Sequence, residues 1–148
     1  MPVAHSLLDA LREIEGVADL DGKQLWARPA GAASVGFHLR HIVGAMDRLL
    51  TYARGQSLRE EQFEYLRSEA GPVDRTAEEL VGEVRRAVDA AVDQLRATPA
   101  ESQLEPRSVG RAQLPSTVQG LLFHAAEHTR RHTGQIIVTA KVVGATAP

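Results

Sequence analysis

The chain has 148 residues, a formal net charge of −2 and no cysteine. The lack of cysteine excludes disulfides, cysteine-ligated zinc, iron–sulfur clusters and a cysteine nucleophile, and the interspersed charges of both signs argue against a nucleic-acid-binding surface. No signal-like N-terminus and no apolar run of 18 residues occur, so we expect a single domain over residues 1–148, no membrane span and a cytoplasmic location.

Apolar residues recur at spacings of three and four in four long segments, which is the pattern of amphipathic helices. These predicted helices span residues 3–18, 34–53, 76–97 and 116–142. A shorter helix is expected at about 57–68, where the sequence has the form of a capping box. No segment shows the alternation typical of a strand, so the predicted fold class is all-α, a four-helix bundle.

The connection between the last two predicted helices covers residues 98–114. It is polar, contains two prolines and a glycine, and is long enough to predict a crossover rather than a tight turn. Arg107 and Arg111 lie in this connection and could line a pocket for an anionic group. A solvated loop charge is the commoner explanation for such residues.

The second predicted helix carries two histidines near its start, and its apolar stripe indicates which of them faces the core. At 100° per residue, His38 lies about 80° from the centre of the stripe and His41 about 140°. Helix geometry therefore favours His38 as the inward-facing residue. His41 would face inward if the side formed by Leu39, Val43 and Leu50 were instead a surface covered by a second subunit.

Three further histidines, His124, His128 and His132, follow at a spacing of four on the last predicted helix. Such residues form a column on one side of a helix, and two neighbours in it can bind one metal ion. A chance pair of this kind is more often hydrogen-bonded than metal-bound. The second cluster supplies a third ligand if the two helices face each other, so the pattern predicts a three-histidine metal site completed by His38 or His41.

Two motifs resemble the DinB-like superfamily, and the resemblance extends over nearly the whole chain. They are Ser34-Val-Gly-Phe-His-Leu-Arg-His41 on the second predicted helix and His128-x-x-x-His132-x-Gly-Gln135 on the last. The resemblance implies an up-down-down-up bundle, often dimeric, with one bound divalent metal. Zinc or nickel is expected before iron, cobalt or manganese.

Carried over by position, the resemblance assigns the metal ligands to His41, His128 and His132. It therefore selects His41 where helix geometry favours His38. His38 and His124 are not in this ligand set: either they lie beside the site, as groups that orient a ligand or transfer a proton, or they are simply packed or solvent-exposed. Gln135 follows His132 by one turn and could orient a ligand or a bound water beside the site.

The superfamily includes metal-dependent thiol S-transferases, so the resemblance implies a small-molecule substrate and a thiol cofactor such as bacillithiol, mycothiol or glutathione. Three neutral imidazoles leave the charge of an ion uncompensated and one position open, which lowers the pKa of a thiol or water there. One alternative is a metal-dependent hydrolase, for which the nearest carboxylate, Glu127, projects about 100° away from His128. Another is a non-catalytic metal- or ligand-binding stress-related protein. A homodimer is expected in each case.

Overall fold

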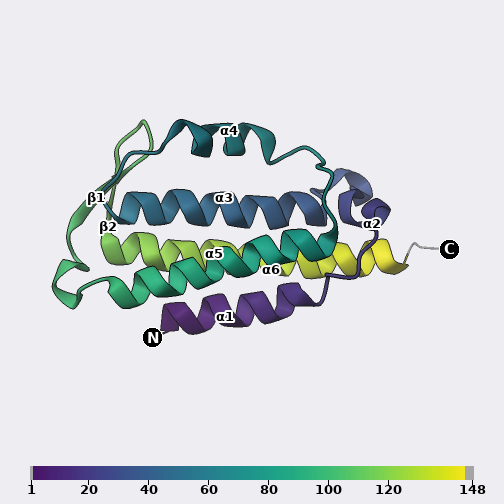
Figure 1. Ribbon diagram of the computed structural model, residues 1–148, viewed down its shortest axis with the longest axis horizontal. Helices are drawn as coiled ribbons and strands as arrows, with labels where there is room; N and C mark the ends of the chain where they lie inside the picture. The colour runs from purple at the N-terminus through teal and green to yellow at the C-terminus, as the bar shows by residue number, and fades with distance from the viewer. Residues whose placement is uncertain (1, 146–148) are drawn as a thin grey trace.

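The computed structural model describes residues 2–145 and consists mainly of four long helices packed side by side (Figure 1). They are α1 (Pro2–Glu15), α3 (Val35–Ala53), α5 (Ala77–Ala97) and α6 (Val118–Ala145). In Figure 1, α1 and α6 run in one direction and α3 and α5 in the other. The all-α class and the up-down-down-up order are therefore confirmed, and the helix bounds lie within three residues of those predicted.

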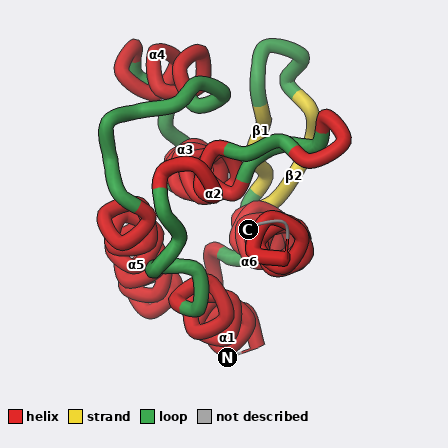
Figure 2. The backbone as a smooth tube through the Cα atoms, turned by 90° about the vertical axis from the view of Figure 1, so that its right-hand side faces the viewer, coloured by secondary structure: helices red, strands yellow, loops and turns green. Residues whose placement is uncertain are grey.

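The apolar stripes of the four helices meet in one hydrophobic core. Viewed along the bundle, α1 contacts α5 and α6, and α3 contacts the same two helices from the opposite side (Figure 2). The largest fully buried side chains come from all four helices and include Leu7, Ile14, Leu39, Met46, Val84, Val88 and Ile136. Burial of these stripes is the main source of stability for a bundle of this kind.

Side-chain caps fix where two of the long helices begin. Ser34 accepts a hydrogen bond from the Phe37 backbone N–H at 3.1 Å. Thr76 and Glu79 form the predicted capping box, in which each side chain accepts from the other residue's backbone N–H. The capping box expected at Ser57 is wrong, because the helix there starts later and the Gln62 side chain caps its first turn.

The connection that travels the length of the bundle is residues 54–76, between α3 and α5, and not residues 98–114 as expected (Figure 1). It contains α4 (Glu60–Ser68), which lies outside the core along α3. The sequence could not show this, because the direction of a connection depends on which ends of the bundle its helices reach.

Residues 98–117 stay at one end of the bundle. They form a short 3₁₀ turn and an antiparallel hairpin of β1 (Pro106–Val109) and β2 (Leu114–Thr117). The prediction of no strand is wrong here, because four-residue strands containing prolines are too short to show alternation. Since residues 116 and 117 pair within β2, α6 begins at Val118.

Both ends of α4 are held against α3 by buried polar side chains. Near its start, Gln62 donates to the Asp47 carboxylate at 2.7 Å. At its end, the buried Arg40 guanidinium donates to the carbonyl oxygens of Ser68 at 2.5 Å and Gly71 at 2.8 Å. These contacts fix the position of the chain just after α4.

The side of α3 formed by Leu39, Val43 and Leu50, which a second subunit would have to cover for His41 to face inward, is covered within the chain. Leu39 and Leu50 are buried, and Val43 is partly buried against the core. No second subunit is needed to cover this surface, and the prediction of a homodimer rests on family resemblance alone. Within residues 2–145, no helix has an apolar stretch long enough to cross a membrane.

We expect Gly36→Ala to destabilise the protein by about 1–3 kcal/mol through overpacking. An added Cβ would lie 2.6 to 2.8 Å from three ring atoms of Trp26, at the end of α2 (Gly22–Trp26). The control is Gly134→Ala in α6, where an added Cβ meets nothing within 4 Å and alanine should stabilise the helix by up to about 1 kcal/mol. Chemical denaturation measures both, and equal effects would contradict the prediction.

Candidate metal centre

Helices α3 and α6 bring four of the six histidines together. His41 Nε2 lies 2.9 Å from His128 Nε2, and His38 Nδ1 lies 2.9 Å from His132 Nδ1. The rings of His128 and His132 are 4.5 Å apart between centroids. One ring nitrogen from each of His41, His128 and His132 lies within 4.8 Å of the other two, so these three residues could hold one metal ion.

The position of His41 follows from a third neighbour of α3 that the apolar stripe does not indicate. The stripe faces α5 and α6, but α4 lies along another side of α3. A residue about 140° from the stripe therefore faces the space between α4 and α6 rather than open solvent. The His41 side chain is 19% exposed, and its ring stacks on Phe37 with centroids 5.3 Å apart. His38 is buried and meets the ring of His132.

A buried carboxylate, Glu69, orients the His41 ring, and sequence reasoning missed it. Glu69 follows α4 directly, where Arg40 holds the chain, and its Oε1 lies 2.6 Å from His41 Nδ1. Its Oε2 lies 3.4 Å from an Arg48 nitrogen. A carboxylate on the outer nitrogen of a histidine is a common arrangement in metal sites, because it leaves the other nitrogen free to bind.

The surroundings keep three of the histidines neutral. Burial, with the neighbouring His41 as second cause, lowers the pKa of His38 from 6.5 to about 4 and the pKa of His128 to about 4. The same causes, with His128 adding to them, lower the pKa of His132 to about 3. Neutral imidazole is the form that can donate a lone pair to a metal, so this cluster favours an ion over protons at neutral pH.

The hydrogen bonds around the cluster set the proton positions. Glu69 requires the His41 proton on Nδ1, which leaves His41 Nε2 available as a ligand atom. An Arg131 nitrogen lies 2.6 Å from His128 Nδ1, and a guanidinium only donates, so His128 carries its proton on Nε2. That proton is donated to His41 Nε2. Binding of an ion by His128 Nε2 therefore requires Arg131, which is exposed, to move away.

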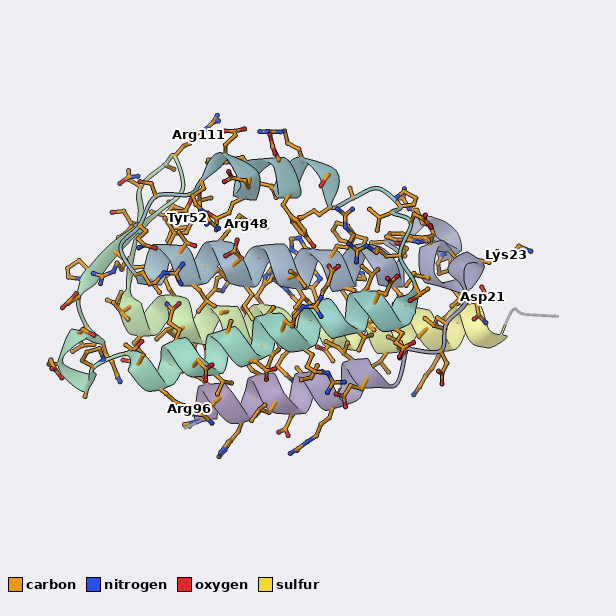
Figure 3. The ribbon with its side chains drawn as sticks, viewed as in Figure 1. Asp21, Lys23, Arg48, Tyr52, Arg96 and Arg111 are labelled. Carbon is orange, nitrogen blue, oxygen red and sulfur yellow. The ribbon has the colours of Figure 1, made fainter. Side chains whose placement is uncertain are left out.

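His41 and His128 also line a cavity of about 690 Å³ between α3, α4, the hairpin loop and α6. Figure 3 shows Arg48 and Tyr52 extending from α3 into the space below α4, and Arg111 on the hairpin loop at its outer edge. No aspartate or glutamate is among the lining residues. The apolar part of the wall is formed by Ala45, Leu49, Leu58, Phe63, Leu66 and Val109.

The remaining residues expected beside the site divide into two groups. His124 lines the cavity, and its Nδ1 lies 3.2 Å from Glu127 Oε2 on the exposed side of α6. Gln135 is exposed and does not line the cavity. Of the two loop arginines, Arg111 lines the cavity, whereas Arg107 donates to the Ala53 carbonyl oxygen and so ties the hairpin to α3.

The sequence matches a family model along most of its length. The model describes the DinB superfamily, and the match covers residues 6–136, which include all four histidines of the cluster. No curated protein matches the sequence.

Proposed function

Because the chain belongs to the DinB superfamily, we propose that it is a divalent-metal-dependent enzyme that transfers a group to the sulfur of a small-molecule thiol. His41, His128 and His132 are the proposed ligands of one ion, with zinc or nickel favoured over iron, cobalt and manganese. The thiol must be a separate small molecule, because the chain contains no cysteine.

The observation that carries this proposal is the cavity beside the histidine cluster. Two of the three proposed ligands line it, so a small molecule in the cavity can reach the open side of the centre. When bound there, a divalent ion would keep its full charge and lower the pKa of a thiol that reaches it. The apolar part of the walls suits the organic part of a substrate.

The residues around the cluster prepare the ligand atoms. Glu69 accepts the His41 Nδ1–H, and the Nδ1 atoms of His38 and His132 share one hydrogen bond, in which either ring can be the donor. Both contacts leave the Nε2 atom of the ligand directed away from its partner. His41 is thus set to bind without a change of proton position, whereas His128 must exchange its contact with Arg131.

Hydrolysis is the weaker alternative, because it needs a base to activate water at the centre. Glu69 is occupied by His41 and Arg48, and Glu127 is paired with His124. No carboxylate lines the cavity. A thiol with a lowered pKa ionises without a dedicated base, so thiol transfer fits the cavity better.

A thiol assay on untagged protein tests the proposed function. With glutathione, bacillithiol or mycothiol and the electrophile monochlorobimane, sulfur should bond to the carbon that carries chlorine, releasing chloride and a proton. We expect a rate at least about a hundredfold above the metal-free protein with one of these thiols. EDTA should abolish this turnover, and added zinc should restore it.

Two results would contradict the proposal. Cleavage of p-nitrophenyl acetate without a thiol, if it depends on the ion, would favour a hydrolase. A bound ion with no turnover of either kind would favour a non-catalytic metal- or ligand-binding protein. A homodimer and a cytoplasmic location remain predictions that accompany the proposal.

A further inference from the structure

The cavity beside the histidine cluster has an unbalanced charge. Two guanidinium groups, those of Arg48 and Arg111, are among its lining residues, and no carboxylate is. Two acids lie next to lining residues: Glu69, which His41 and Arg48 share, and Glu127, which is paired with His124. The cavity wall itself therefore carries two positive charges and no negative charge, before any ion is added.

Arg48 has hydrogen-bond donors that the protein does not use. Its side chain is only 12% exposed, and one nitrogen makes a long contact of 3.4 Å with Glu69. In residues 2–145, no fully buried side-chain nitrogen or oxygen lacks a partner, so the other N–H groups of Arg48 must be open to solvent. The side chain lines this cavity and also a smaller one of about 240 Å³ between α3 and α4, so both are available to these groups.

Arg48 also lies at a suitable distance from the centre. It follows His41 by seven residues, which places both on the same side of α3, about two turns or 10 Å apart along the helix axis. The Glu69 carboxylate bridges the two side chains. A small molecule that reaches the centre with one end could therefore meet Arg48 with a group a few bonds away.

Arg111 lies at the outer edge of the same cavity, in the loop between β1 and β2 (Figure 3). Positive φ angles at Gly110 and Gln113, of 68° and 49°, shape this loop. Arg111 is exposed and has no ion pair or hydrogen bond with another described residue. A lone exposed arginine is usually only solvated. Here a second guanidinium with unused donors lines the same cavity.

We infer that the cavity selects a small-molecule thiol that combines an apolar body with a carboxylate, and that Arg48 and Arg111 bind the carboxylate. A guanidinium matches a carboxylate with two parallel hydrogen bonds, and those of Arg48 are little screened because its side chain is only 12% exposed. This inference rests on the proposed function, because it takes the cavity as the thiol site. It adds to the proposed function that the substrate carries a negative charge, which the histidine cluster alone does not indicate.

The test compares 4-mercaptobenzoate with 4-mercaptobenzamide, which share a ring and a thiol but differ in charge. Isothermal titration calorimetry of the zinc-loaded protein should give at least about tenfold tighter binding of the carboxylate. Arg111→Gln should reduce this ratio about three- to fivefold. Arg48→Lys, which keeps the charge beside Glu69 but cannot form two parallel bonds, should reduce it by a similar factor. The control is Arg86→Gln, an exposed arginine of α5 away from the cavity, which should leave the ratio unchanged.

A wild-type ratio near one would overturn the inference. So would a ratio that Arg111→Gln and Arg48→Lys both leave unchanged, because the carboxylate would then be bound by the ion. The same titrations on EDTA-treated protein separate this inference from the proposed function. If the chain binds no ion, the proposed function fails, and the carboxylate preference of the metal-free protein still shows whether the arginines act as inferred. Circular dichroism establishes that each variant is folded.

Discussion

Replacing any one of His41, His128 and His132 with alanine should reduce the affinity for a divalent ion by at least about a hundredfold, because each change removes one of the three proposed ligands. His38→Ala should cost only about tenfold, because His38 contacts His132 Nδ1 and can act only by orienting that ring. Elemental analysis of untagged, zinc-equilibrated protein measures the occupancy, and a competing chelator gives the affinity.

Two further variants change residues that are not proposed ligands. His5→Ala changes an exposed histidine of α1 and should leave occupancy unchanged. Glu69→Gln weakens the acceptor on His41 Nδ1 and should cost about tenfold. Full occupancy in His41→Ala together with loss in His38→Ala would show that the helix-stripe argument identifies the third ligand correctly. Loss confined to the two α6 variants would show a surface pair, and the proposed enzyme site would be wrong.

Acid should destabilise the metal-free protein as the pH falls from about 6.5 to about 4. The pKa values of His38, His128 and His132 are lowered to about 4, 4 and 3 in the folded state from an ordinary value of 6.5. In this window the unfolded chain binds protons that the folded chain does not, so protons favour unfolding. Above pH 6.5 both states are unprotonated at these rings and the effect disappears.

The free energy of unfolding should fall by about 2–4 kcal/mol across that window. This is less than the three pKa shifts would give in full, because His128 and His132 are partly open to solvent. Urea denaturation of EDTA-treated protein at several pH values measures it. His38→Asn should remove part of the slope. Zinc should protect the protein through the upper part of the window, since the ion competes with protons for the same nitrogens. Constant stability between pH 6.5 and 4 would contradict the prediction.

The sequence predicts the helices and one half of the cluster well, because both depend on short-range spacing. The stripes of α1, α3, α5 and α6 repeat at the helical period and face the core. His128 and His132 lie one turn apart, so any helix that contains them places them together. The caps at Ser34 and Thr76 were also predictable, because each cap bonds within its own first turn.

The other half of the site depends on contacts between distant parts of the chain. His41 faces the cluster because α4 gives α3 a third neighbour, and the periodicity of α3 contains no sign of α4. Glu69 is 28 residues from His41 and lies in a segment without periodicity. The cavity requires α4 and the hairpin loop to lie on the same side of the bundle, which Figures 1 and 2 show and no local pattern predicts.

The shared carboxylate of Glu69 should couple the histidine cluster thermodynamically to an anion bound at Arg48. If His41 Nε2 bound an ion, the His41 Nδ1–H would become a stronger hydrogen-bond donor. Glu69 would then move closer to His41, and its contact with Arg48, already long at 3.4 Å, would loosen. Arg48 is then freer to bind an anion. Because such coupling is reciprocal, an anion on Arg48 should tighten the hold of the histidines by the same factor. The cofactor and the substrate would thus each raise the other's affinity, in whichever order they arrive.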